Sequence, residues 1–210
     1  KIFINLLGEI RNNKLTQDSI ELLNSRYIPN FRPDENHGYI TLTTHNATAQ
    51  LINDNKLADI KLKSKIFNAN VKNDFPEYLY PTEKELELKV GAQVMFIKND
   101  SSLEKRYYNG KIAIITEFGK DFIIVEADDE EIFVKTEKWE NVKYSLNEST
   151  KEIDEEVIGS FEQFPLKLAW AITVHKSQGL TFEKAVIDVN AAFAFGQVYV
   201  ALSRCKSLEG

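Results

Sequence analysis

The chain has 210 residues, of which 43% are hydrophobic and 28% are charged, and its net charge is −6. These values are ordinary for a globular protein and allow one large domain or two small ones with a buried core. The single cysteine, Cys205, excludes an intrachain disulfide framework and a cysteine-based zinc site, which needs several thiolates. Because nucleic-acid binding follows local charge, the acidic balance restricts any such binding to a few positive or neutral strips.

The location expected from the sequence is cytoplasmic, with no membrane partner. No apolar stretch approaches the ~20 residues that span a bilayer. The N-terminus, KIFIN, lacks an initiator Met and the regions of a signal peptide, so we expect a cut inside a longer gene product. The absence of a disulfide framework favours an intracellular protein, and the rich use of Lys, Asn and Ile is typical of an AT-rich bacterial genome.

The first part of the chain predicts an α/β arrangement. Residues 1–27 predict two short helices, because apolar side chains recur at helical spacing, and Thr16 is the expected N-cap of the second. The alternating run 39–43 predicts a strand, and residues 47–57 predict a helix capped by Asn46. In open α/β folds the turn between such elements lies at the carboxyl edge of the sheet, where ligands bind.

The middle of the chain predicts a small β-barrel. Residues 58–84 are expected to form an irregular connection, and residues 145–156 an exposed loop. Between them, short apolar runs alternate with turn signals, which is typical of a small barrel. The expected strands are 86–90, 94–97, 112–115, 122–125 and 132–134, with turns at 109–110, 118–121 and 128–131.

The last 50 residues return to an α/β pattern. Residues 166–174 predict a strand, with a short helix as the alternative, and 185–189 predict a buried strand. Apolar residues from 195 to 202 predict a final helix. The simplest architecture is an α/β domain interrupted by an inserted barrel, with parts at 1–84 and 161–210 and the insertion at 85–160.

The polar turn after residue 174 has the composition of a phosphate site. Gly179 permits a backbone conformation that other residues resist, and successive N–H groups in such a turn can cradle an anion. Lys176 adds a full positive charge. Hydroxyl, imidazole and amide groups come from Thr173, Ser177, His175 and Gln178. An ordinary polar turn after a strand is the alternative, with equal weight on the composition alone.

Arg204 is a candidate phosphate ligand near the end of the final helix. Gln197, Ala201 and Arg204 follow one another at helical spacing, on a face expected to be opposite the apolar stripe. A planar guanidinium can bind a phosphoryl oxygen bidentately. The alternative, which the composition alone favours, is a solvent-exposed arginine on a helix surface.

Two further groups of polar residues could contact nucleic acid. The turn 43–46 offers hydroxyls and an amide for phosphate contacts, although capping by Asn46 is the alternative. Basic and aromatic residues occur together in the expected barrel, where they could bind single strands by charge and stacking or where the tyrosines could pack inside. They are Lys98, Lys105, Arg106, Tyr107, Tyr108 and Lys111.

The sequence predicts no metal site and lacks the usual nucleotide-binding loop. None of the three histidines, His37, His45 and His175, has metal-ligand spacing to another. The acidic run 128–131 is expected to be a solvated turn. No GxxxxGK[ST] loop occurs anywhere in the chain.

Two long motifs resemble those of a known family. The sequence FPLKLAWAITVHKSQG at 164–179 resembles motif V of superfamily 1 helicases, and it is closest to the Pif-one and RecD-type branch. The sequence QVYVALSR at 197–204 resembles motif VI of the same branch. Two weaker matches lie upstream. The sequence LTTHN at 42–46, with Ile52, Asn53 and Leu57, resembles the motif IV region. The sequence VGAQVM at 90–95, with Asn109 and Gly110, resembles the start of the family's inserted SH3-like barrel.

The resemblance implies the C-terminal half of a 5′ to 3′ DNA helicase, with a RecA-like second domain interrupted by an SH3-like β-barrel. It implies ATP and Mg²⁺ as cofactors, bound mainly by an N-terminal RecA-like domain, and single-stranded DNA as the partner. Arg204 would be the catalytic arginine finger that stabilises charge on the transferring phosphoryl group. The other implied ATP-binding residues are Gln178, Gly179 and Gln197, and the implied DNA-binding residues are Thr44, Asn46, Thr173, His175 and Lys176.

A large departure from the family is the absence of the first RecA-like domain with its Walker A lysine and Mg²⁺-binding acids. We therefore expect that the chain alone neither hydrolyses ATP nor unwinds DNA. Two alternatives remain open at this point: a non-enzymatic single-stranded DNA-binding module, and a protein-docking module built on the barrel.

Overall fold

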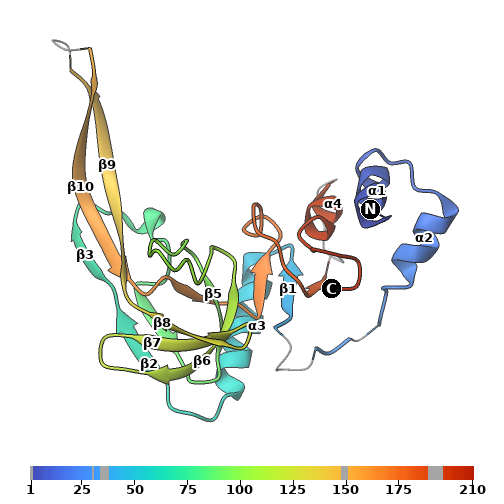
Figure 1. Cartoon of the computed structure of the whole chain (residues 1–210), viewed down its shortest axis with the longest axis horizontal. Coiled ribbons are helices and arrows are strands. Elements are labelled where there is room, and N and C mark those ends of the chain that lie inside the picture. Colours follow the sequence, from blue (N-terminus) through green and yellow to red (C-terminus); the bar gives the residue numbers. More distant parts are fainter. Residues whose placement is uncertain (1, 30, 34–37, 148–150, 189–195) are drawn as a thin grey trace. The chain divides into compact units, whose positions relative to one another are not determined.

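A computed structural model describes residues 2–29, 31–33, 38–147, 151–188 and 196–210, and they form two compact units (Figure 1). The first unit combines Lys1–Asp59 with Ala169–Gly210, and the second is Ile60–Leu168. The expected insertion, 85–160, lies inside the second unit. The second unit therefore interrupts the first in the sequence.

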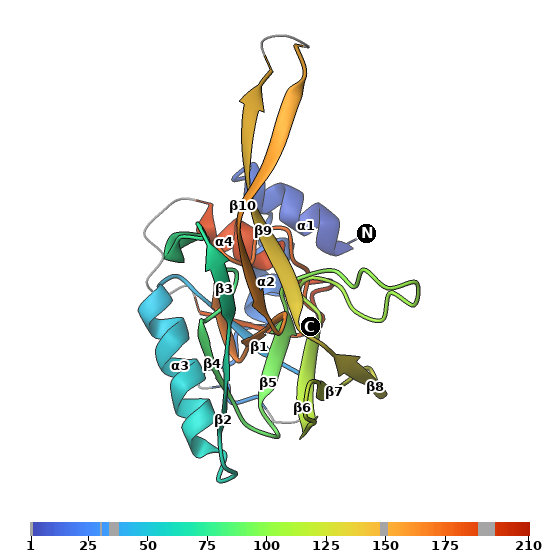
Figure 2. The same ribbon diagram turned by 90° about the vertical axis from the view of Figure 1, so that its left-hand side faces the viewer.

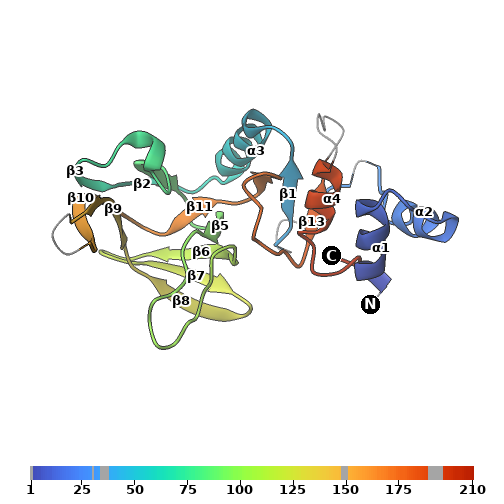
Figure 3. The same cartoon turned by 90° about the horizontal axis from the view of Figure 1, so that it is seen from above.

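The first unit is built on a small parallel sheet. Strand β1 (Ile40–Thr43) lies between β12 (Ala171–Thr173) and β13 (Ala185–Ile187), and both pairings are parallel. Helix α3 (Asn46–Asp59) packs on β1 and β12 (Figure 3). The β1 side chains of Ile40 and Leu42, which point to the same face of the sheet, are completely buried. The α/β character predicted for the two ends of the chain is confirmed.

Three further helices complete the first unit. Helices α1 (Ile2–Arg11) and α2 (Gln17–Asn24) confirm the two helices predicted for residues 1–27. Thr16 caps α2 as expected, since its hydroxyl accepts a hydrogen bond from the backbone N–H of Ser19 at 3.3 Å. Helix α4 (Gln197–Leu202) packs against α1, in which Leu6 is buried.

The second unit consists mainly of antiparallel strands. One sheet has the order β11 (Leu166–Leu168), β5 (Gln93–Phe96), β6 (Ile112–Phe118), β7 (Ile123–Ala127) and β8 (Glu130–Val134). A second has the order β3 (Asn70–Asn73), β10 (Ile153–Gln163) and β9 (Glu137–Leu146). The third pairs β2 (Lys65–Asn68) with β4 (Glu85–Leu88), and the 3₁₀ turn η1 spans Glu77–Leu79. Over the described residues these are open sheets, so a closed barrel is not confirmed.

Three sequence predictions of secondary structure are wrong. Residues 58–84 were expected to be irregular but contain β2 and β3, and residues 145–156 were expected to be a loop but include the outer ends of β9 and β10. These strands are largely exposed and contain many polar and charged residues, so their composition did not indicate strands. The single strand expected at 166–174 is divided into β11 and β12, which belong to different sheets and different units.

Strands β9 and β10 form a long hairpin that extends beyond its neighbours (Figure 2). Strand β3 pairs with β10 only from Gly159 to Glu162, so the hairpin is two-stranded from Val157 outward. A register shift between Val157 and Gly159 marks a bulge at this boundary. A Cβ atom at Gly159 would overlap the carbonyl oxygen of Asp74, so the close approach of the two backbones requires glycine.

Candidate nucleotide and nucleic-acid interface

The parallel sheet of the first unit brings two sequence-predicted turns to the same edge. Strands β1 and β12 run in the same direction, so the turns that follow them both leave at the carboxyl edge. The backbone N–H of Val174 donates to the carbonyl oxygen of Thr43 at 2.8 Å. This bond extends the ladder beyond the strands and holds the two turns side by side.

The turn after β1 is shaped by Thr43 and presents two polar side chains. The hydroxyl of Thr43, which is buried, accepts from the backbone N–H of His45 at 3.2 Å. The hydroxyl of Thr44 lies 2.8 Å from His45 Nδ1. Asn46 is exposed and is the first residue of α3, so it does not occupy the N-cap position that the sequence predicted. An exposed amide at this point is available to a ligand.

The turn after β12 divides its side chains between the interior and solvent. Thr173 is buried and its hydroxyl accepts from the N–H of Lys176 at 3.3 Å, while the buried Ser177 hydroxyl donates to the carbonyl of Val174 at 2.7 Å. These two hydroxyls therefore shape the turn from inside. The exposed positions are His175, Lys176, Gln178 and Gly179.

Gly179 ends this turn in a left-handed conformation. Its φ is +82°, a region that L side chains rarely adopt, and no atom lies within 4 Å of the position a Cβ would occupy. Glycine is therefore required here by backbone conformation rather than by crowding. The N–H of the next residue, Leu180, donates to the carbonyl of Ser177 at 3.0 Å and closes the turn.

Asn53 holds β12 in place, a role that the sequence did not predict. Its side-chain amide accepts from the N–H of Ala171 at 2.9 Å and donates to the carbonyl of the same residue at 3.0 Å. Asn53 is 8% exposed, and it lies between Ala49 and Leu57 on the buried face of α3. A polar residue on the apolar stripe of a helix was the available signal, because a buried amide needs hydrogen-bond partners.

Arg204 is half-buried and its guanidinium is held by three acceptors of its own unit. Nε donates to the carbonyl of Val200 at 3.1 Å, and Nη1 donates to the carbonyl of Leu180 at 3.2 Å. Nη2 donates to the hydroxyl of Ser203 at 2.9 Å. The Leu180 bond connects Arg204 directly to the end of the turn at Gly179. The sequence alternative of a solvent-exposed arginine is therefore wrong.

The helix face predicted around Arg204 is also wrong in detail. Helix α4 ends at Leu202, so Arg204 follows the helix instead of lying on its surface. Ala201, expected on the face opposite the apolar stripe, is completely buried, and Gln197 is half-buried at the start of the helix. Tight packing of this short helix against α1 leaves no purely polar face.

Backbone bonds join the segment around Arg204 to the segment after the turn. The N–H of Phe182 donates to the carbonyl of Arg204 at 2.8 Å, and the N–H of Lys206 donates to the carbonyl of Phe182 at 2.9 Å. Phe182 and Cys205 form an isolated parallel bridge. Burial raises the pKa of the Cys205 thiol, an effect that the neighbouring Arg204 charge opposes.

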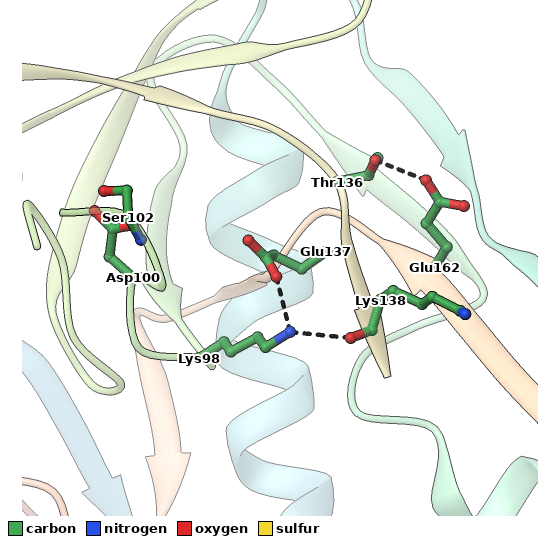
Figure 4. Close-up of polar contacts among 7 residues, drawn as sticks. All are labelled: Lys98, Asp100, Ser102, Thr136, Glu137, Lys138 and Glu162. Atoms are coloured by element: carbon green, nitrogen blue, oxygen red, sulfur yellow. Dashed lines mark hydrogen bonds and ion pairs between the residues drawn. The ribbon is translucent and has the colours of Figure 1, made fainter. Parts of the chain in front are cut away.

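The basic and aromatic residues predicted in the barrel mostly have structural roles. Tyr107 is buried and stacks on Phe96 with ring centroids 4.1 Å apart, and desolvation raises its pKa to about 12. Lys98 pairs with Glu137 at 2.8 Å (Figure 4) and lies 5.0 Å from the ring centroid of Trp139.

The other members of this group differ in exposure. Lys111 pairs with Asp128 at 3.0 Å and is largely buried. Exposed positions in the same loop are Lys105, Arg106 and Tyr108. Of the two tyrosines, only Tyr108 is therefore available to stack on a base. Tyr107 packs inside, as the alternative predicted.

No protein-family profile matches the chain. The ATP-dependent DNA helicase Pif1 of Psychrobacter sp. is 34% identical over 98% of this chain and 38% of its own length. The ATP-dependent DNA helicase Pif1 of Bdellovibrio bacteriovorus is 30% identical over 100% of this chain and 46% of its own length. Unliganded Pif1 from Bacteroides sp superposes with a TM-score of 0.91 and 43% identity, over 99% of this chain and 48% of that one.

The chain belongs to the Pif1-type branch of the superfamily 1 helicases, as the C-terminal half. It spans less than half the length of these Pif1 relatives. The likeness to Pif1 structures supports a RecA-like helicase domain for its α/β unit. Bacteroides Pif1 is also known in complex with ADP-AlF4 and bound to ssDNA, and these structures match with TM-scores of 0.90 and 0.71. In the part of this chain that the structure describes, no helix is long and apolar enough to cross a membrane.

Proposed function

We propose that the chain is the C-terminal part of an ATP-dependent DNA helicase, which couples ATP hydrolysis to translocation on single-stranded DNA and duplex unwinding. The observation that carries the proposal is the bond between Arg204 and Leu180, at the end of the turn that presents His175 and Lys176. A short hydrogen-bonded segment thus connects the candidate phosphate ligand Arg204 to the candidate DNA ligands His175 and Lys176. The Bacteroides Pif1 complexes with ADP-AlF4 and with ssDNA support both ligands.

On the nucleotide side, we assign Arg204 as the arginine finger. Its three bonds use three of the five N–H donors of a guanidinium, so two remain available beyond the described residues. Held in this way, the guanidinium is preorganised for a bidentate contact with phosphoryl oxygens and for stabilising charge that develops on them. Gln178 and Gly179 supply an exposed amide and an open backbone nearby, and Gln197 lies at the start of the same short helix.

On the DNA side, we assign Thr44, Asn46, His175 and Lys176 as contacts to the phosphate backbone. Their turns lie side by side at one sheet edge, and each side chain has a hydrogen-bonding group that suits a phosphate oxygen. We assign Thr173 a supporting role instead of a DNA contact, because its side chain is buried and its hydroxyl accepts from the N–H of Lys176. It shapes the turn that presents its two exposed neighbours.

In the proposal, ATP binding also requires residues that this chain does not contain. Among the described residues, no group of three or more His, Cys, Asp or Glu side chains is placed to hold a metal ion. We assign Mg²⁺ and most ATP contacts to an N-terminal RecA-like domain, the proposed partner of this chain. The proposal includes an SH3-like character for the inserted unit, and predicts that the isolated chain neither hydrolyses ATP nor unwinds DNA.

A second candidate is a non-enzymatic module that binds single-stranded DNA. The loop that exposes Lys105, Arg106 and Tyr108 favours it, because charge with one stacking ring can bind single strands. A protein-docking module is the third class of function.

One experiment separates the first candidate from the others. DNA-stimulated ATPase and strand separation are measured for the isolated chain and for the parent protein. We expect activity in the parent and none in the isolated chain. If the folded parent shows no DNA-stimulated ATPase, the non-enzymatic binding module becomes the assigned function.

A further inference from the structure

Strand β8 lies at an open edge of the five-stranded sheet. It is the last strand in the order β11-β5-β6-β7-β8, and Figures 2 and 3 show it at the margin of that sheet, next to β7. In the described part of the chain, no strand pairs with its other side. Such an edge presents unpaired N–H and C=O groups to which another strand can bind. Two common protections of an open edge, proline and a β-bulge, are absent from β8.

The geometry of the β7–β8 hairpin determines which backbone groups of β8 face this edge. The two strands are joined by the two-residue turn 128–129, in which both residues have positive φ, 54° and 62°. In such a hairpin the pair that flanks the turn, Ala127 with Glu130, exchanges hydrogen bonds, and every second pair after it does the same. The N–H and C=O groups of Glu131 and Phe133 therefore point away from β7, toward the open edge.

The side chains of β8 alternate between the core and solvent. Ile132 and Val134 are buried, whereas Phe133 is 55% exposed. Glu131 is exposed, and so is Lys135, which directly follows the strand and continues the alternation. A large aromatic side chain thus lies at the open edge between an acidic residue and a basic residue, all three on the outer face of the sheet.

The charge on this outer face differs between the two ends of β8. Glu131 lies directly opposite Glu126 of β7, and both side chains are exposed. Like charges in directly opposite positions are destabilising, so a cation placed beside them would relieve the repulsion. At the other end of the strand, Lys135 carries such a charge. Because the turn 128–131 is entirely acidic, the edge repels nucleic acid and suits a protein strand that brings a cation to Glu131.

We propose that two copies of the chain pair through β8 in an antiparallel register centred on Phe133. In this register the Phe133 side chains of the two copies lie opposite each other, and Glu131 of each copy lies opposite Lys135 of the other. The sequence EIFVK at 131–135 is thus complementary to itself when its direction is reversed. Main-chain hydrogen bonds across the edge join the two sheets into one.

The proposed contact uses the same patch on both copies. It is therefore isologous and closes as a dimer instead of adding further copies. The area is small, so the dimer is weak and its population depends on concentration. This inference does not depend on the proposed helicase function.

Sedimentation velocity of the chain over a concentration series tests the proposal. We expect the weight-average mass to rise with concentration from the 24.1 kDa of one chain toward twice that value and no further. Two charge-reversal variants, Glu131→Lys and Lys135→Glu, test the register. Each variant alone replaces two attractive cross-strand pairs of the dimer by two repulsive pairs, so it is expected to associate at least about tenfold more weakly than the wild type.

An equimolar mixture of the two variants is the decisive sample. In the mixed dimer the substituted position 131 of one copy faces the substituted position 135 of the other, and the native Lys135 faces the native Glu131. Both pairs again have opposite charges, so we expect the mixture to dimerise although neither variant does so alone. The double variant E131K/K135E restores both pairs within one sequence and is expected to associate about as strongly as the wild type.

Matched controls make the same charge changes elsewhere in the second unit. Glu85→Lys and Lys61→Glu are at exposed positions outside β8 and are expected to associate like the wild type, and circular dichroism shows whether each variant is folded. A wild type that stays monomeric at about 1 mM overturns the proposal and leaves the edge to a strand of another protein. Growth beyond a dimer, wild-type association of a folded Glu131→Lys variant, or a mixture that stays monomeric overturns it as well.

Discussion

The Nη1 atom of Arg204 donates to the carbonyl oxygen of Leu180 at 3.2 Å, and Leu180 directly follows the left-handed Gly179. Residues on both sides of this bond are tied by backbone hydrogen bonds through Phe182. Hydrogen bonds thus connect the turn after β12 to the guanidinium of Arg204 directly. In a Pif1-type helicase this arrangement would couple the DNA contacts to the phosphate contacts within one small region.

Asn53→Ala is expected to destabilise the first unit. The substitution removes both hydrogen bonds to Ala171 and leaves a buried N–H and a buried carbonyl without partners, which costs about 2–4 kcal/mol in the free energy of unfolding. Urea unfolding measures the difference. The matched control is Asn55→Ala, on the exposed side of the same helix, which is expected to change stability by less than about 0.5 kcal/mol. Equal effects of the two substitutions would contradict this role of Asn53.

Gly159→Ala is expected to destabilise the second unit. The added Cβ would meet the carbonyl oxygen of Asp74, which is backbone and cannot rotate away, so a loss of about 1–3 kcal/mol or more is expected. In contrast, Gly8→Ala in α1 adds a Cβ with no atom within 4 Å and is expected to stabilise that helix by about 0.5–1 kcal/mol. Thermal unfolding of the two variants shows opposite shifts in Tm if the account is right.

The buried Tyr107 is expected to ionise at unusually high pH. Its pKa of about 12, raised from 10 by desolvation, makes the protonated form favourable in the folded state. The stabilising contribution is fully present below pH 10 and is lost as pH rises from 10 to about 12, because the unfolded tyrosine ionises first. A pH titration followed by phenolate absorbance records the ionisation of Tyr107 as a step at high pH. Tyr107→Phe should remove that step, whereas Tyr108→Phe, at an exposed position, should leave it unchanged.

Lys176→Ala is expected to reduce both the affinity for single-stranded DNA and the salt dependence of that affinity. Loss of a phosphate contact should reduce the slope of log K against log salt by about 0.7, the value for one contact to a single strand. Lys120→Ala removes an exposed lysine of the second unit and serves as the control, with no change in slope expected. Fluorescence anisotropy over a salt series gives both slopes. An unchanged slope for Lys176→Ala would remove this residue from the DNA contacts.

The α/β part of the fold was readable from the sequence because its signals are local. Residues 40–43 alternate apolar and polar side chains and three of the four are β-branched, and a polar turn and a helix follow immediately, so strand, turn and helix were all predicted. By contrast, β2 and the outer ends of β9 and β10 are exposed and polar or mixed in composition. Strand β2 forms by pairing with β4, as in the pairing of Lys65 with Leu88, which no local pattern reveals.

The candidate site was predictable in its residue types and only partly in its geometry. The sequence indicated that Gly179 permits a backbone conformation that other residues resist, and its φ is indeed in the left-handed region. The inward orientation of Thr173 and the end of α4 before Arg204 depend on packing in three dimensions, so the sequence predicted neither. The role of Asn53 was missed because its hydrogen-bond partner, Ala171, lies 118 residues away in the chain.

The measurement that tests the central claim most directly is the DNA-stimulated ATPase of the parent protein with Arg204→Ala, beside wild type and the control Arg11→Ala. Arg11 is an exposed cation at the end of α1, so its removal should leave the activity unchanged. An arginine finger contributes about 10³-fold or more to the rate of phosphoryl transfer, so we predict a loss of that size for Arg204→Ala with the fold intact. A folded Arg204→Ala protein that retains wild-type activity would contradict the assignment of Arg204 and, with it, the proposed coupling through Leu180.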